Sequence, residues 1–213
     1  FHNSINANDP AGPGACSGPG PDRMYREYQA GYFGLVSMAY APVAADTQWG
    51  IELHRHDMGP ILWPRTGFLS PDGTAVAEGF RHAHPHPSSL IAEDPKDGRT
   101  YLYVFANICS TRPDRQSMVG AARSPIEARG LPGSYLNFRD GDYTEPSLPE
   151  NMQEDLPLLL RRQGGRADAI HPELYNVNRF FVARLKRSGL FLSVEAYHEG
   201  GALHTALRLS RNL

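Results

Sequence analysis

The sequence GFRHAHPHPSSLIAEDPKDGRTYLYVFAN, residues 79–107, decides the expected fold of this chain. Two short apolar runs, SSLIAED and TYLYVFAN, flank the turn sequence PKDG, in which proline, aspartate and glycine all favour chain reversal. The second run is rich in Tyr, Phe and Val, residues that suit a pleated, half-buried surface. The stretch therefore predicts a β-hairpin.

The same pattern recurs on both sides of this hairpin. Apolar bursts such as YFGLVSMAYAP, SMVGAARSPI, NRFFVARL, GLFLSVEAY and HTALRLS alternate with segments rich in Gly, Pro, Asp and Asn. Short strands separated by turns predict an all-β fold. The one helical candidate is QEDLPLLLRRQGG, residues 153–165, where Glu154 and Asp155 favour a helix start and Gly164 an end.

A weak internal repeat orders these strands. His86-Pro87 and His171-Pro172 each precede an aromatic-rich strand, and they recur at a spacing of about 85 residues. Ser124 and Ser210, near the end of a later strand in each unit, recur at nearly the same spacing. Repeated antiparallel units bury their apolar faces by stacking, as the blades of a propeller do.

The net charge and the hydropathy of the chain limit the classes of partner that we expect. The net charge of −2 provides no broad basic field, so we expect no nucleic-acid partner and no anionic membrane surface. No stretch approaches the roughly 20 apolar residues of a membrane span. Cys16 and Cys109 either form one disulfide or remain two thiols, and the sequence leaves both open. The chain opens on FHNS and closes on ALRLSRNL, both typical of strand edges, and we expect a processed or truncated chain.

The order of these motifs resembles a known family. HPSSLI, an acidic turn, YLYVFAN and MVGAARSPI follow one another like the strands of a blade in five-bladed β-propeller glycoside hydrolases, the arabinanase, invertase and levansucrase superfamily. VSMAYAPVAADTQW and PELYNVNRFFVARL resemble parts of neighbouring blades. The resemblance implies one propeller domain, or part of one, over residues 1–213, built from four-stranded antiparallel blades. We expect insertions at about 10–23 and, with the short helix, at about 146–168.

Glycoside hydrolysis requires two carboxyl groups that flank the scissile bond. In the resembled enzymes a Glu at a later blade start is the acid, and Glu145 in GDYTEPSLP matches that position. The pKa-tuning Asp-Pro of the family is replaced here by His86-Pro87. The first catalytic Asp of the family would lie before Phe1. Glu145 is thus the one catalytic candidate, and its alternative is a rim residue on a loop.

A sugar pocket pairs apolar or aromatic platforms with polar groups that match hydroxyls. Trp63 is a candidate platform, with core packing as its alternative, and Arg123 is a candidate ligand with an inter-blade salt bridge as its alternative. The full set of predicted substrate-binding residues is His2, Trp63, His86, Arg123, His171, Asn176 and Arg179.

The run HAHPH places His82, His84 and His86 on one side of an extended chain. Alternate imidazoles can share a cation, but the prolines distort strand geometry and no carboxylate or thiol stands at ligand spacing. We assign no metal site, and metal-dependent chemistry at these histidines is a third, weaker alternative to sugar binding or solvation.

The resemblance implies a secreted hydrolase, a glycosidase of carbohydrate metabolism that acts on oligo- or polysaccharide. Its expected location is extracellular or periplasmic, with the cytoplasm left open. The alternative is a non-catalytic sugar-binding or scaffold propeller. The expected partner is a carbohydrate ligand. No cofactor is expected, and a structural calcium ion on the propeller axis stays open.

Overall fold

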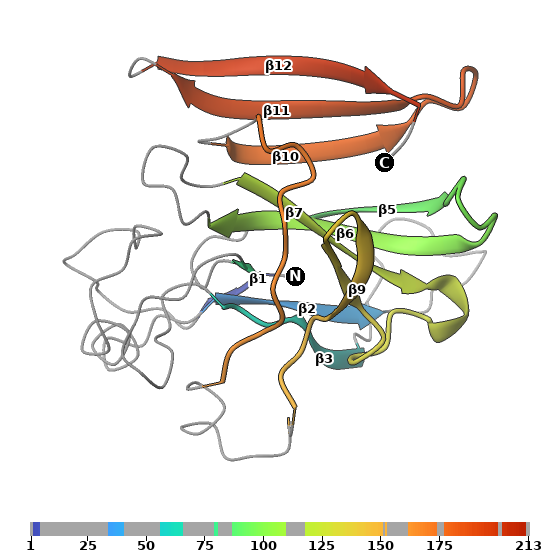
Figure 1. The fold of residues 1–213 in the computed structure, drawn as a ribbon, viewed down its shortest axis with the longest axis vertical. Helices are drawn as coiled ribbons and strands as arrows, with labels where there is room; N and C mark the ends of the chain where they lie inside the picture. Colours follow the sequence, from blue (N-terminus) through green and yellow to red (C-terminus); the bar gives the residue numbers. More distant parts are fainter. Residues whose placement is uncertain are drawn as a thin grey trace, which may run out of the picture.

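The computed structural model describes residues 2–4, 34–40, 56–65, 79–80, 87–109, 118–150, 152, 162–173, 177–199 and 202–211 (Figure 1). These residues form twelve strands and one 3-10 turn. In chain order they are β1 (His2–Ser4), β2 (Gly34–Tyr40), β3 (His56–Leu62), β4 (Gly79–Phe80), β5 (Ser88–Glu93), β6 (Thr100–Cys109), β7 (Met118–Pro125), η1 (Ile126–Ala128), β8 (Leu136–Arg139), β9 (Asp142–Pro146), β10 (Val177–Arg184), β11 (Phe191–Glu199) and β12 (Ala202–Ser210).

The strands belong to three antiparallel sheets, which lie one above another in Figure 1. β1, β2 and β3 form the first sheet. The central sheet runs in the order β4-β6-β7-β8-β9, with β5 also paired to β6, and it curls at β8 and β9. β10, β11 and β12 form the third sheet, in which β12 is an edge strand.

The predicted hairpin is confirmed at the centre of the fold. β5 pairs with the first half of β6, from Glu93 opposite Thr100 to Ser88 opposite Phe105. The turn closes through the amide of Gly98, which donates to the carbonyl of Asp94 at 2.8 Å. Gly98 adopts a φ of 69°, a conformation that glycine reaches without steric penalty. The PKDG sequence thus sets the register between β5 and β6.

β6 of the central sheet contacts both other sheets, because its side chains alternate between two hydrophobic cores, one on each face of the central sheet. Tyr101, Tyr103 and Phe105 point to one face and pack with Phe180 and Phe191 of the third sheet. The alternate residues pack on the opposite face, against apolar residues of β2 and β3; they are Leu102, Val104, Ala106 and Ile108. An almost continuous apolar strand is what burial on both faces requires.

The segment 162–170 crosses the central sheet without forming a strand of its own. Arg166 pairs with Gly79 and Ala169 pairs with Gly120 as isolated bridges. Side chains at Gly164 and Gly165 would collide with the carbonyls of Trp63 and Pro146, respectively. Gly164 was predicted to end a helix, whereas in the structure it lies where two backbone segments approach closely.

The all-β prediction is confirmed, since the described residues contain no α-helix. The remainder of the predicted helix, residues 153–161, and the expected insertion at about 10–23 lie outside the described residues. So do the side chains of both cysteines. The assignment of the sheets to propeller blades stays a prediction, as does the extent of the domain.

Candidate functional site

A cavity of about 410 Å³ opens between the central sheet and the third sheet. Its apolar lining includes the aromatic rings of Phe105, Phe180 and Phe191. Four polar residues complete the lining described here: His171, Ser193, Arg208 and Ser210. The cavity lies within the usual size range of small-molecule sites, and its mixture of aromatic and convergent polar groups is typical of them.

The strand register explains why these residues meet. On β11, Phe191 and Ser193 are two residues apart and therefore share a face of the sheet. Across the ladder, Ser193 stands opposite Arg208 of β12, and Phe191 stands opposite Ser210. One face of the third sheet thus brings an aromatic ring, a guanidinium group and two hydroxyls to the same cavity.

A carboxylate lies next to this polar row, buried within the third sheet. Glu195 is 0% exposed and accepts hydrogen bonds from the Ser193 hydroxyl at 2.8 Å and from Nε of Arg208 at 3.0 Å. A buried carboxylate is costly unless it is paired and hydrogen-bonded. The side chain of Arg208 nevertheless remains 44% exposed. Glu195 therefore fixes one edge of the guanidinium while much of the group still faces solvent at the cavity.

His171 lies at the cavity, as a residue of the segment that leads from the central sheet into β10. Its side chain is 41% exposed, and its Nδ1 lies 3.4 Å from a carboxylate oxygen of Glu173. The imidazole can donate or accept a hydrogen bond according to its tautomer. Among the predicted substrate-binding residues, His171 is one that the structure places at this cavity.

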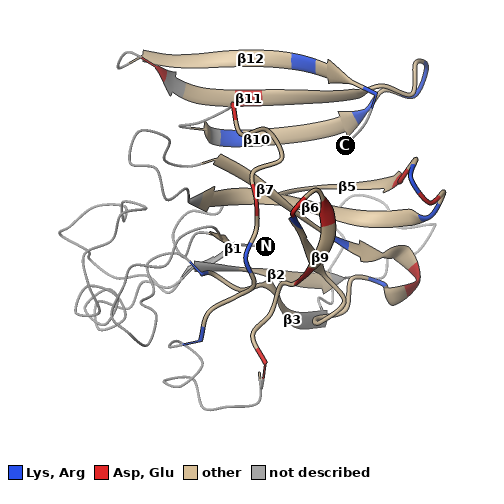
Figure 2. Ribbon diagram, viewed as in Figure 1, with Lys and Arg blue, Asp and Glu red and all other residues tan. Residues whose placement is uncertain are grey.

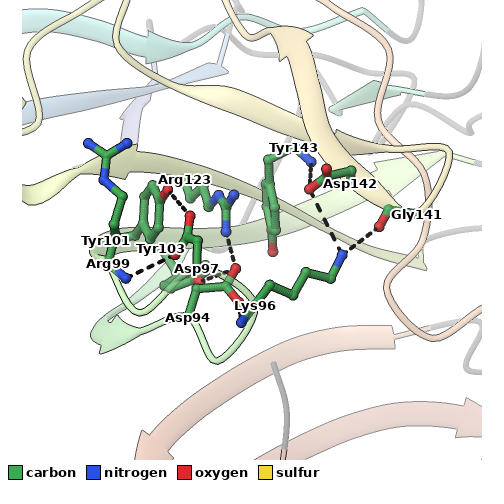
Figure 3. Close-up of polar contacts among 10 residues, drawn as sticks. All are labelled: Asp94, Lys96, Asp97, Arg99, Tyr101, Tyr103, Arg123, Gly141, Asp142 and Tyr143. Carbon is green, nitrogen blue, oxygen red and sulfur yellow. Dashed lines mark hydrogen bonds and ion pairs between the residues drawn. The ribbon is translucent and has the colours of Figure 1, made fainter.

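Arg123, in contrast, is enclosed by its neighbours (Figure 3). Its guanidinium carbon lies 3.9 Å from the ring centre of Tyr101 and 4.4 Å from that of Tyr143. The same group forms an ion pair with Asp94, whose side chain is 9% exposed. Asp94 also accepts a hydrogen bond from the hydroxyl of Tyr103 at 3.3 Å. This geometry fits the salt-bridge alternative, although both partners belong to the central sheet.

Contacts beside Arg123 join the turn between β5 and β6 to the turn between β8 and β9 (Figure 3). Lys96, in the turn after β5, donates from Nζ to the carbonyl of Gly141 at 3.1 Å. It also lies 3.9 Å from the carboxylate of Asp142 at the start of β9. Asp97, in the same turn as Lys96, accepts a hydrogen bond from the hydroxyl of Tyr101 in β6, which lowers the pKa of the Asp97 carboxyl. These contacts indicate a structural role for the cluster.

Trp63 and Glu145 lie beside the crossing segment. Trp63 is 2% exposed and donates from its indole nitrogen to the carbonyl of Arg162 at 3.1 Å. This burial fits the core-packing alternative rather than a sugar platform. Glu145 is half-buried on β9 and accepts a hydrogen bond from the amide of Arg166 at 3.2 Å. Neither residue lines the cavity.

Of the other predicted ligands, the structure describes Arg179 and the backbone of His2. Arg179 is exposed on β10, opposite Ala196. His2 pairs through its backbone with Val36, and its side chain lies outside what is described. His86 and Asn176 lie outside the described residues, as do His82 and His84.

Ser193, Glu195 and Arg208 were not among the residues predicted from the sequence. The signal was present in GLFLSVEAY, where alternation places Phe191, Ser193 and Glu195 on one face of a strand. Arg208 could be added only with the register between β11 and β12, which the sequence alone does not supply. The pairing of β11 with β12 thus completes the polar row by placing Arg208 beside Ser193 and Glu195.

No protein-family model matches this chain, and the searches of curated proteins and of solved structures also found no match. Within the described residues, no group of three or more His, Cys, Asp or Glu side chains could hold a metal ion. The same residues include no helix that is long and apolar enough to span a membrane.

Proposed function

We propose that this chain binds carbohydrate in the cavity between the central and third sheets. The observation that carries the proposal is the meeting of two partly exposed polar side chains, Arg208 and His171, at one small cavity with an otherwise largely apolar lining. A partly exposed guanidinium and an imidazole suit the hydroxyls of a sugar, and an apolar lining suits its C–H groups. The motif order that resembles carbohydrate-active propellers independently supports the same ligand class. On this proposal the three sheets are consecutive propeller blades.

Binding is favoured over hydrolysis at this cavity. Hydrolysis requires two carboxyl groups on either side of the glycosidic bond. The described lining of the cavity contains no Asp or Glu side chain. Glu195 lies next to the polar row, but it is fully buried and already occupied by Ser193 and Arg208. The cavity therefore offers polar groups that can hydrogen-bond a ligand, and an apolar lining, rather than a pair of carboxyl groups.

The test is titration calorimetry with a panel of oligosaccharides that covers plant and microbial linkages. His171→Ala removes a partly exposed polar group from the cavity, and loss of such a hydrogen bond should weaken binding about three- to tenfold. His204→Ala is the matched control, because His204 is exposed on β12, where its ring lies 5.5 Å from that of Tyr197. Absence of binding to every glycan in the panel, or equal weakening by both variants, would contradict the proposal.

Glycoside hydrolysis is the second candidate, and Glu145 is the observation that favours it. Its half-buried carboxylate accepts a hydrogen bond from the Arg166 amide, and in the motif order it corresponds to the acid of the resembled enzymes. Glu145→Gln keeps the shape of the side chain and removes its proton transfer, so a general acid predicts a loss of roughly 10² to 10⁴ in rate. Glu150→Gln, at an exposed site after β9, is the control. Unchanged turnover of a cleaved glycan by Glu145→Gln would exclude the assignment.

A further inference from the structure

The guanidinium of Arg208 presents unused hydrogen-bond donors at the cavity. A guanidinium has five N–H donors and no acceptor, and Glu195 accepts from the Nε of Arg208 alone. The two terminal nitrogens form no hydrogen bond with the described residues, and the side chain is 44% exposed. These nitrogens form the end of a planar fork, a geometry that fits the two oxygens of one carboxylate.

A second guanidinium lies on the same face of the third sheet. Arg184 of β10 stands opposite Phe191, whose ring belongs to the cavity, and its guanidinium carbon lies 5.9 Å from the centre of that ring. The Arg184 side chain is exposed and forms no ion pair with the described residues. Figure 2 shows basic residues on β10 and on β12, the two outer strands of this sheet.

The carboxylates of this face do not balance its cations. The face contains three strand rows, which are Arg184–Phe191–Ser210, Val182–Ser193–Arg208 and Phe180–Glu195–Ala206. Glu195 is the one carboxylate in these rows, and its oxygens already bind Ser193 and Arg208. Glu173 lies 3.4 Å from His171 and forms no ion pair with either arginine. A ligand with a negative charge would therefore supply the counterion that Arg184 lacks among the described residues.

Ser193 makes the site suitable for a sugar acid rather than for a simple carboxylate. Its hydroxyl proton is donated to Glu195 at 2.8 Å, so its oxygen can only accept a hydrogen bond from a ligand in the cavity. Arg208 stands directly opposite Ser193 across the strand pair. An acceptor beside a carboxylate-binding fork matches a ligand that carries a hydroxyl group close to a carboxylate.

We propose that the cavity selects a uronic acid, a sugar whose ring carries a carboxylate, within an acidic oligosaccharide. This selectivity rests on the carbohydrate binding proposed above and names the class of sugar. The Arg208 fork binds the carboxylate, and Ser193 accepts from a ring hydroxyl. Arg184 supplies a second positive charge, and the hydrogen bond to Glu195 keeps the fork oriented. The volume of about 410 Å³ suits one small ligand.

Titration calorimetry with matched pairs of ligands tests this selectivity. Each pair consists of an oligouronate, built on galacturonate, glucuronate or mannuronate, and its methyl ester, which keeps the ring and the linkage but removes the charge. Charge-assisted hydrogen bonds are roughly twice as strong as neutral ones. Because the fork forms two of them, one acid of the panel should bind about 10- to 100-fold more tightly than its ester.

Arg208→Lys keeps a cation beside Glu195 but removes the fork, so the preference for the acid over the ester should fall about tenfold. Arg99→Lys is the matched control and should keep the preference. Arg99 forms an exposed ion pair with Glu127 at 3.9 Å, and it lies at the end of the β5–β6 hairpin that is remote from Phe105. Circular dichroism and thermal unfolding verify that both variants fold.

If Arg208→Lys does not fold, the double variant Arg208→Gln, Glu195→Gln removes both charges without leaving one buried alone. It should bind the acid and the ester equally. An ester or a neutral glycan that binds the original chain as tightly as the acid overturns the selectivity and leaves carbohydrate binding standing. So does a preference that survives Arg208→Lys unchanged, or tighter binding of a sulfated neutral glycan. Absence of binding to acids, esters and neutral glycans alike contradicts carbohydrate binding itself.

Discussion

Arg123 and Arg208 each form an ion pair with a buried carboxylate, yet the two pairs differ in what surrounds the cation. Two tyrosine rings cover Arg123, and its side chain is 12% exposed. Arg208 belongs to an edge strand, and its side chain is 44% exposed beside the cavity. Its partner Glu195 is the more buried of the two carboxylates. An arginine paired with a buried carboxylate is thus enclosed in one case and partly exposed in the other. We call Arg123–Asp94 the closed pair and Arg208–Glu195 the open pair.

The difference separates a structural role from a binding role. A guanidinium that is stacked on both faces and paired along its edge has little surface left for a ligand. One that is held through Nε alone remains oriented and still accessible. Removing the partner of a closed pair leaves a charge that water cannot reach, whereas removing the partner of an open pair leaves a charge that water partly solvates. Replacing Asp94 and Glu195 by their isosteric amides therefore tests whether the two ion pairs contribute differently to stability.

The largest effect is expected for Asp94→Asn. The amide keeps the shape of the side chain but leaves Arg123 without a counterion, which should lower the free energy of unfolding by about 3 kcal/mol. For Glu195→Gln we expect about 1 kcal/mol, since the partly exposed Arg208 can gain hydration. Urea unfolding of the three proteins measures both differences.

Asp140→Asn controls for the removal of a surface carboxylate, because the side chain of Asp140 is 82% exposed. Its effect should stay within about 0.5 kcal/mol. Equal destabilisation by Asp94→Asn and Glu195→Gln would contradict the distinction between a closed and an open pair. A larger effect at Glu195 would reverse it and make the third sheet depend on its buried carboxylate.

Local sequence chemistry predicted the framework better than the site. The hairpin between β5 and β6 followed from PKDG and two apolar runs because turn residues act over a few positions. Gly164 illustrates the limit, since its role depends on a close approach to Trp63, about 100 residues away in the chain. His171 could be proposed from its place in the repeat. Arg208 could not, because it reaches the cavity only through its pairing with Ser193.

The hydroxyl of Tyr103 gives a smaller, pH-dependent test of the closed pair. Burial raises the pKa of Tyr103 to about 12, and burial raises the pKa of Tyr135, on the opposite face of the central sheet, to a similar value. Their ordinary value is 10.0. Between these pH values the unfolded chain loses a proton that the folded chain keeps, so stability is complete below about pH 10 and falls as the pH rises toward 12.

Tyr103→Phe and Tyr135→Phe should isolate the contributions of these two residues to the slope, to which Tyr101 and Tyr143 also contribute because their pKa values are raised as well. Each variant removes one titrating hydroxyl, so each should lose less stability than the original chain between about pH 10 and 12. At neutral pH they should differ, because Tyr103 donates to Asp94 at 3.3 Å whereas the Tyr135 hydroxyl has no hydrogen-bond partner among the described residues. Tyr103→Phe should therefore lower the free energy of unfolding by about 1 kcal/mol, and Tyr135→Phe should be neutral or stabilising. Thermal unfolding at pH 7 and across the alkaline range measures both. A neutral-pH loss at Tyr135 as large as that at Tyr103 would mean that the bond to Asp94 adds nothing to the closed pair.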